Sequence, residues 1–351
     1  RHVCFPYYVD KLLGLNPSGL DMMEGTNIPS FDRIIADSDL DGLCAAAVLK
    51  SFNPDAEVIF SHAALVRSGK IDDLITSTTA MVDLPFHPSC GWYLDHHQTN
   101  RPTKEEEKNF LESGGICNWE AAPSAARVAY DLLSQMIDLS HLEEIMPIVD
   151  ALDSGGISLE EFLADSPVLQ LSRTLSLREE EYMQQVLKLF ASKKSITEIL
   201  SDELVSKHIN KVASERKDIE SFISKNTKII DRLAVCRLEN SGFHSNGYLV
   251  TAWAGDKADA CCIIHGYHDG SLENPSRPPL SASFYANSFL ENGQNRYDLS
   301  RMATSLDPSG GGHVNACGCR VQSPGIESNL DHWLGMWTNR ETVLALAKNS
   351  E

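Results

Sequence analysis

Long apolar runs and basic residues are both scarce in this sequence. No apolar stretch approaches the roughly 20 residues that cross a bilayer as a helix, and no segment has the pattern of a secretory signal peptide. Lys and Arg together number 30 against 49 Asp and Glu, which gives a formal net charge of −19. Long nucleic acids are held mainly by cationic side chains that neutralise phosphates. The composition therefore argues against a membrane protein and against a protein that coats long DNA or RNA.

Paired CxxC motifs are also missing, although the chain has nine cysteines. An odd number of cysteines without a secretory signal predicts reduced thiols in a cytoplasmic protein. Two groups leave a zinc site open: Cys261 and Cys262 with His265 and His268, and Cys317 and Cys319 with His313. Structural zinc sites usually draw their ligands from closely paired cysteines. We therefore expect these cysteines to lie buried in strands.

Strands that alternate with helices dominate the first part of the chain. Short β-type runs that end in polar or charged residues occupy 31–36, 57–63, 79–84 and 91–97, and helical patterns include 43–52 and 124–136. This alternation is typical of an α/β protein with a doubly wound parallel sheet. Ligands of such sheets bind at the carboxyl ends of the strands, where the acidic clusters of this sequence fall.

The length of 351 residues favours more than one domain. Residues 157–230 are strongly helical in composition, and β-type runs return at 232–238, 247–253, 260–265 and 280–286. We therefore predict a doubly wound α/β domain at 1–156, a helical connector at 157–230, and a smaller α/β domain with a mixed sheet at 231–351. The chain begins at Arg1 rather than methionine, which leaves the native N-terminus open.

Three aspartates alternate directly after the first predicted strand. In the segment DSDLDG, Asp37, Asp39 and Asp41 can converge on one side of a strand-end loop. Like charges this close do not all remain ionised without a cation. A calcium loop of the EF-hand type would place a glutamate where Val48 stands. The segment therefore predicts a different kind of metal site.

Two further predicted strands end in residues that bind metals or transfer protons. Asp83 ends one strand, and Asp95, His96 and His97 end the next. Carboxylates with imidazoles and few thiols suit manganese or magnesium better than structural zinc. Two metals that share a bridging carboxylate could bind a phosphate and activate a water for in-line attack. These strand ends therefore predict a metal-dependent reaction centre.

Five motifs resemble those of the DHH phosphoesterases. They are DSDLDG at 37–42, VDLP at 82–85, LDHHQ at 94–98, VDALDSG at 149–155, and SGGGHVNACGC at 309–319. The last resembles the GGGH signature of the DHH-associated C-terminal domain. The five stand in the family's order and cover most of the chain. The resemblance implies a two-domain hydrolase with manganese in the first domain and substrate binding in the second.

The resemblance also implies roles for individual residues. The metal ligands would be Asp39, Asp41, Asp83 and His96, with Asp83 as the bridge, and Asp153 or alternatively Asp150 from the fourth motif. Asp95 would orient His96, and His97 would face the substrate or a metal-bound water. Two manganese ions are expected, with magnesium as an alternative. Many members carry a histidine at the position of Ile35, and Asp37 is the candidate to fill this vacancy.

The second domain is expected to contact the substrate. A glycine-rich backbone can approach an anion closely, and a histidine can add a hydrogen bond. The candidate substrate-binding residues are Gly310, Gly311, Gly312, His313, Asn315, Arg320 and Arg101. Members often carry an arginine in a Ser-x-Arg-Ser stretch, where this sequence has Tyr285 followed by Ala286.

The predicted function is hydrolysis of small phosphorylated nucleotides. Candidate substrates are short oligonucleotides, linear or cyclic dinucleotides, and 3′-phosphoadenosine 5′-phosphate. The negative net charge favours a short substrate, because repulsion grows with the number of phosphates. The alternatives are a RecJ-like single-strand exonuclease, a pyrophosphatase or exopolyphosphatase, and a non-catalytic nucleotide-binding module. A homodimer is left open, and the sequence does not identify the ester that is cut.

Overall fold

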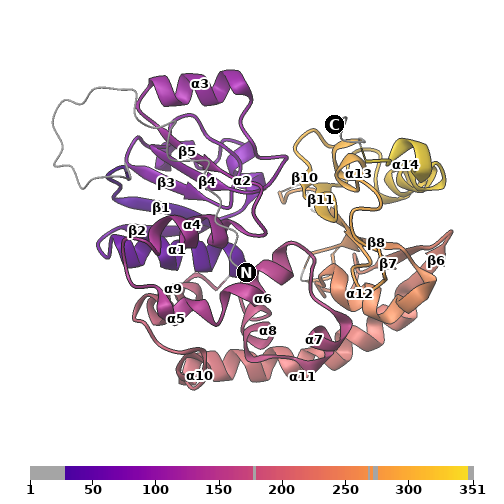
Figure 1. Ribbon diagram of the computed structural model, residues 1–351. Coiled ribbons are helices and arrows are strands. Elements are labelled where there is room, and N and C mark those ends of the chain that lie inside the picture. The colour runs from indigo at the N-terminus through magenta and orange to yellow at the C-terminus, as the bar shows by residue number, and fades with distance from the viewer. Residues whose placement is uncertain (1–27, 177–178, 268, 272–275, 347–351) are drawn as a thin grey trace, which may run out of the picture.

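The chain folds into two lobes, each built on its own β-sheet (Figure 1). The computed structural model describes residues 28–176, 179–267, 269–271 and 276–346. Within these residues no helix is long and apolar enough to cross a membrane. The predicted α/β class, with a parallel sheet followed by a mixed sheet, is confirmed.

The first lobe contains a parallel sheet of five strands in the order β2-β1-β3-β4-β5. The strands are β1 (Arg33–Asp37), β2 (Glu57–Ser61), β3 (Thr79–Val82), β4 (Trp92–Asp95) and β5 (Ile116–Trp119). The strand order reverses between β1 and β3, which makes their carboxyl ends the expected binding position of a doubly wound sheet. Four of these strands were predicted from the sequence, and β5 was not.

Helices cover both faces of this sheet. They are α1 (Leu40–Phe52), α2 (Ala63–Arg67), η1 (Asp72–Leu74), α3 (Lys104–Glu112), α4 (Ala125–Leu133), α5 (Ser140–Glu143) and α6 (Met146–Asp153). Alternate residues of β1 face opposite sides, so Ile34 packs in the core beneath α1 and α4 while Ile35 packs in a second core with Met81 and Tyr93. Ile35 is fully buried and contributes no ligand atom.

Helix α1 begins in direct contact with the backbone of β1. Asp39 is its N-cap and accepts a hydrogen bond from the N–H of Gly42. A Cβ atom at position 42 would lie 2.3 Å from the carbonyl oxygen of Asp37. Gly42 is therefore required for this close approach, which brings the three aspartates of DSDLDG to the end of the sheet.

Helices connect the two lobes. They are α7 (Leu159–Ala164), α8 (Pro167–Ser172), α9 (Glu180–Ala191), α10 (Ile196–Leu200) and α11 (Glu203–Asn226). Helix α9 packs against α1 and completes the core of the first lobe. Helix α11 has 24 residues, about 36 Å of length, and runs beneath both lobes in Figure 1. It leads directly into the first strand of the second sheet.

The second lobe contains a mixed sheet in the order β10-β11-β9-β8-β7-β6, in which only β7 and β8 pair in parallel. Its strands are β6 (Thr227–Ile230), β7 (Leu233–Arg237), β8 (Ala260–His265), β9 (Ser281–Ala286), β10 (Gly311–Gly312) and β11 (Ala316–Arg320). Its helices are α12 (Gly247–Ala254), η2 (Gly255–Lys257), α13 (Ser300–Thr304), α14 (Ile326–Thr338) and α15 (Arg340–Val343).

The β-strand predicted at 247–253 is wrong, because these residues form helix α12. A short apolar run has the same appearance in a buried strand and in a buried helix. The helix packs across β8 and β9. A Cβ atom at Gly247 would lie 2.1 Å from the ring of Tyr285, so the glycine permits the helix to lie directly on the sheet.

The cysteines of the second lobe lie in strands, as expected. Cys261, Cys262, Cys317 and Cys319 are buried and free of disulfides. Neither of the potential metal-binding groups found among the described residues contains a cysteine. His268, which the zinc alternative would use, lies outside the described residues.

Candidate metal centre

Many of the predicted acidic and histidine residues meet at the carboxyl ends of β1, β3 and β4. The end of α6 and the loop between β10 and β11 reach the same place. Two overlapping groups of side chains converge here. One contains Asp83, Asp95, His96 and His97, and the other contains His96, His97, Asp153 and His313. Within each group, one ligand atom from every residue lies within 4.8 Å of the others. The centre therefore joins residues from both lobes. Asp37 ends β1 and Asp39 follows it, but both stand outside the two groups of converging ligand atoms.

The carboxylate of Asp41 is held by the start of helix α4. Its two oxygens accept hydrogen bonds from the backbone N–H groups of Ala125 and Ala126, each at 2.7 Å. Free N–H groups at a helix N-terminus favour a carboxylate. Burial and the charge of Asp153 nevertheless raise the pKa of Asp41 to about 8.

Asp83 is placed by an uncommon backbone conformation at the end of β3. Its φ of 59° lies in the left-handed region, which aspartate tolerates better than most residues. Its N–H donates to the carbonyl of Leu94 at 3.1 Å, which ties it to β4. Its Oδ1 is buried and accepts no hydrogen bond. A buried acceptor without a donor is costly, and a cation would satisfy it.

The imidazole of His96 is oriented so that Nε2 faces the carboxylates. Nδ1 donates to the carbonyl of Ala122 at 3.0 Å, because a carbonyl can only accept. Nε2 lies 2.9 Å from Asp153, 3.5 Å from Asp41 and 3.9 Å from Asp83, yet it makes no hydrogen bond. In the neutral ring this nitrogen carries a lone pair. Nε2 is therefore the His96 atom that faces the neighbouring carboxylates.

Asp95 orients His97 and not the ring of His96, which corrects the expected pairing. Its Oδ1 accepts from Nδ1 of His97 at 2.9 Å and from the backbone N–H of His96 at 2.8 Å. Burial opposes ionisation of Asp95, but the charge and hydrogen bond of His97 hold its pKa below the usual value. Because a backbone carbonyl already holds the His96 ring, the carboxylate is available to the neighbouring histidine.

The hydroxyl of Tyr93 holds the other oxygen of Asp95. It lies 2.8 Å from Oδ2, so Tyr93, Asp95 and His97 form a hydrogen-bonded series along the end of β4.

We expect Tyr93→Phe to lower kcat about 3- to 10-fold, since one hydrogen bond is lost, with little change in KM. Steady-state kinetics test this, and equal loss in Tyr130→Phe, an aromatic outside the network, would point to a general effect instead.

Asp153, and not Asp150, lies in the centre. The Oδ2 of Asp153 is 2.9 Å from Nε2 of His96 and 3.3 Å from Nε2 of His313. Asp150 instead accepts from Arg127 at 2.6 Å and from Ser124 at 2.7 Å. The two aspartates are three residues apart on α6 but have different partners. The fourth motif thus contributes one residue to the candidate metal centre and one to the packing of α4.

The electrostatics of the cluster call for a cation. Burial, followed by the charge of Asp39, raises the pKa of Asp37 well above its usual value, and burial with the charges of Asp41 and Asp39 does the same for Asp83. Burial opposes a charged imidazolium, but Asp153 and Asp41 raise the pKa of His96 to about 10, so without a metal the Nε2 proton faces these carboxylates and a bound cation would take its place. Oxygen and imidazole donors with unpaired buried atoms fit a divalent metal such as manganese or magnesium.

Solved structures share this two-lobed arrangement. The pGpG-specific phosphodiesterase PggH from Vibrio cholerae is 21% identical, with a TM-score of 0.61 over 88% of this chain and 98% of the other. An exopolyphosphatase-related protein from Bacteroides fragilis is 14% identical, with a TM-score of 0.52 over 88% and 93%. A DHH domain described as belonging to a family of ribosomal proteins is 11% identical, with a TM-score of 0.56 over 90% and 88%.

The chain has the DHH fold. No protein-family model and no curated protein matches the sequence. The resemblance read from the five motifs is therefore confirmed by the fold.

In this DHH fold the glycine-rich segment contacts the first lobe directly. Thr99 donates to the carbonyl of Gly312 at 3.1 Å and accepts from its N–H at 3.0 Å, and Arg67 donates to the carbonyl of Ser309 at 3.0 Å. A Cβ atom at Gly311 would lie 3.0 Å from the guanidinium of Arg67. The glycines allow the lobes to dock, and the N–H of Gly312 is engaged by Thr99 rather than open to an anion.

His313 reaches the candidate metal centre from the second lobe. Its ring stacks on His97 with centroids 4.1 Å apart, and it lies 4.6 Å from the ring of His96. Burial lowers the pKa of His313, which favours the neutral ring. The histidine predicted to bind substrate therefore belongs to one of the two potential metal-binding groups.

The remaining predicted substrate contacts lie outside the cluster. Arg101 stacks over the ring of Trp119, 4.1 Å from its centroid. The side-chain amide of Asn315 accepts a hydrogen bond from the backbone N–H of Asn295 and donates one to its side chain, both within the second lobe. Arg320 lines a separate pocket of the second lobe. The roles of Tyr93, Arg67 and Thr99 were not predicted, and only Tyr93 carried a signal, two residues before Asp95 on the same strand face.

Proposed function

We propose that the protein is a metal-dependent phosphodiesterase that hydrolyses short nucleotide substrates. The observation that carries this proposal is the convergence of buried ligand atoms: Nε2 of His96 lies 2.9 Å from Asp153 and 3.9 Å from Asp83, between the two lobes. The negative net charge favours a substrate with few phosphates. The similar structure described as a pGpG-specific phosphodiesterase makes linear dinucleotides the first substrates to test.

Residues of the first lobe would hold two manganese ions. Asp39, Asp41, Asp83, His96 and Asp153 are the proposed ligands, and Asp37 is the candidate for the position that Ile35 leaves without a donor. Bound metal would neutralise the phosphate and lower the pKa of a water molecule for in-line attack. These carboxylates would then ionise together, because the cation offsets their mutual repulsion.

The two stacked histidines would contact the substrate. Asp95 holds Nδ1 of His97, which leaves Nε2 as the nitrogen that can reach a phosphate oxygen. His313, from the second lobe, stacks on the ring of His97. Docking of the two lobes therefore brings His313 to the site that already holds His97.

Incubation with manganese and a linear dinucleotide should release mononucleotides. The same assay with cyclic dinucleotides, 3′-phosphoadenosine 5′-phosphate and pyrophosphate would define the preferred ester. Absence of turnover on every one of these substrates would contradict the enzymatic proposal and favour a non-catalytic nucleotide-binding module.

Manganese should also stabilise the fold in the absence of substrate. A ligand that binds only the folded state at 100 times its Kd adds about 2.7 kcal/mol to the free energy of unfolding. We expect the unfolding temperature to rise with added manganese and to fall again with EDTA. An unfolding temperature that does not respond to manganese or magnesium would argue against the metal centre.

A further inference from the structure

Asp153 lies at the end of a helix, where the backbone is least constrained. It is the final residue of α6, and its Oδ2 lies 2.9 Å from Nε2 of His96. The last four carbonyls of a helix have no partner within the helix, and helix ends open locally at little cost in free energy. A proposed metal ligand in this position keeps its place only if the end of the helix is capped.

The second lobe supplies part of the cap of α6. Two of the last four carbonyls accept hydrogen bonds from N–H groups a few residues further along the chain. The carbonyl of Leu152 accepts instead from the hydroxyl of Tyr248 at 2.8 Å, and Tyr248 belongs to α12 of the second lobe. Just beyond the helix, the carbonyl of Gly155 accepts from the side-chain amide of Gln294, also of the second lobe. The helix end that carries Asp153 is therefore held from the other lobe.

Tyr248 is itself held firmly by its surroundings. Its ring packs against Phe162 and Phe289, with centroids 5.6 Å and 5.8 Å away. It is the second residue of α12, and its neighbour Gly247 lies directly on the second sheet. Burial, followed by the charge of Asp153, raises the pKa of Tyr248 above its usual value, so the hydroxyl keeps the proton that it donates.

We propose that Tyr248 is a positioning residue, which holds Asp153 at the metal centre by capping α6 from the second lobe. The inference rests on the metal centre of the proposed function and goes beyond it, because it makes the affinity for the metal depend on the docking of the lobes. The dependence is reciprocal: metal held by Asp153 stabilises the docked lobes by the same free energy that docking adds to metal binding.

The test measures the affinity for manganese by calorimetry without substrate. In Tyr248→Phe the ring keeps its packing and only the hydroxyl is lost, so we expect the variant to fold. Its Kd for manganese should rise about 3- to 10-fold, the scale of one hydrogen bond. The manganese concentration that gives half-maximal hydrolysis should rise by a similar factor, while kcat at saturating manganese stays near that of the wild type. A purely structural role would lower the unfolding temperature and leave both quantities unchanged.

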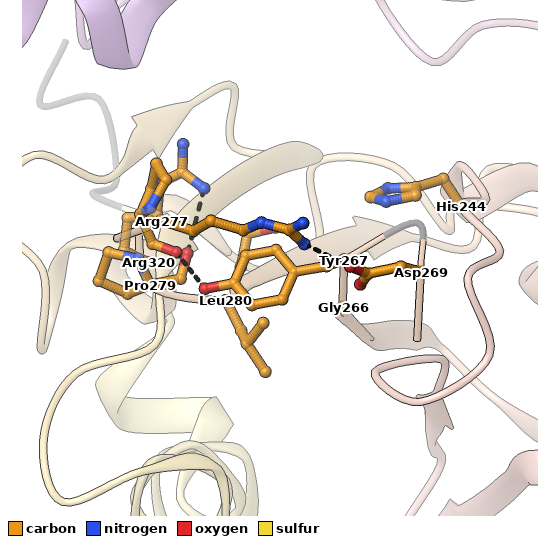
Figure 2. A pocket seen from close by; sticks show the side chains of 10 residues that line it. His244, Gly266, Tyr267, Asp269, Arg277, Pro279, Leu280 and Arg320 are labelled. Atoms are coloured by element: carbon orange, nitrogen blue, oxygen red, sulfur yellow. Dashed lines mark hydrogen bonds and ion pairs between the residues drawn. The ribbon is translucent and has the colours of Figure 1, made fainter. Parts of the chain in front are cut away.

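Tyr267→Phe is the matched control. Tyr267 lines the pocket of the second lobe that Figure 2 shows, and its hydroxyl donates to the carbonyl of Pro278 at 2.5 Å. This variant loses the same kind of hydrogen bond within the second lobe alone, so its Kd for manganese should equal that of the wild type. Gln294→Leu, which removes the contact with Gly155, should weaken manganese binding in the same direction as Tyr248→Phe.

Unchanged affinity for manganese in Tyr248→Phe, or in Gln294→Leu where Tyr248→Phe does not fold, would overturn the positioning role while the hydrolase function stood. Equal weakening in Tyr267→Phe would overturn it as well. If the wild type binds manganese but cleaves none of the substrates, the proposed function fails, and weaker binding to Tyr248→Phe still supports the positioning role. A wild-type protein that binds neither manganese nor magnesium would refute both.

Discussion

Asp83→Asn should abolish hydrolysis and leave the protein folded. The carboxylate of Asp83 is buried, its Oδ1 has no hydrogen-bond donor, and Nε2 of His96 lies 3.9 Å from it. We expect kcat/KM to fall by roughly 1000-fold, the upper scale for losing one group that stabilises developing charge. Asparagine is chosen because it tolerates the positive φ of this position better than alanine does.

Stability measurements separate this effect from misfolding. Burial and neighbouring carboxylates raise the pKa of Asp83. At neutral pH, above the pKa of an exposed aspartate, this group therefore opposes folding of the metal-free protein. The variant should unfold at a temperature equal to or above that of the metal-free wild type, and it should lose most of the response to manganese. Wild-type activity in Asp83→Asn would remove the residue from the centre.

Asp153→Asn and Asp150→Asn should have opposite consequences, although the two residues lie on one helix. Asp153 is the carboxylate that contacts His96 and His313 together. We expect its replacement to reduce kcat/KM at least about 100-fold. Asp150 accepts two hydrogen bonds from Arg127 and one from Ser124. Its replacement should cost about 1–3 kcal/mol of stability with activity retained once the protein is folded.

Chemical unfolding and steady-state kinetics on the two variants provide this comparison. Each variant serves as the control for the other, since both exchange an aspartate of α6 for asparagine. Strong loss of activity in Asp150→Asn at unchanged stability would reverse the assignment made from the geometry.

The positions of the strand ends could be predicted because two sequence features mark each of them. The runs at 33–37, 79–82 and 92–95 are apolar on both faces, as a covered parallel sheet requires, and each ends in or is followed by aspartate. Parallel strands place their carboxyl ends on one edge, so Asp37, Asp83 and Asp95 had to converge. The choice between Asp153 and Asp150 needed the structure, because both lie on α6 and only the packing of α4 distinguishes them.

Contacts between distant segments could not be predicted in the same way. Nothing in the residues around Arg67 or Thr99 indicates that they contact Ser309 and Gly312, more than 200 positions away. Asp95 pairs with His97 because Nδ1 of His96 already donates its hydrogen bond to the carbonyl of Ala122. These relations arise from tertiary packing, and local patterns carry no record of them.

The narrow contact between the glycine-rich segment and the first lobe bears on how products leave. Near the centre, the junction consists of the hydrogen bonds of Thr99 and Arg67 and the approach of His313 to Asp153. Such exposed hydrogen bonds contribute only about 1 kcal/mol each, so this edge of the junction can open at modest cost. The hydrogen bond from Tyr248 to the carbonyl of Leu152 and the packing of Phe162 against Tyr248 and Phe289 hold the lobes together elsewhere. We expect turnover to be governed by the opening of this edge, and a decrease in kcat with solvent viscosity would measure it.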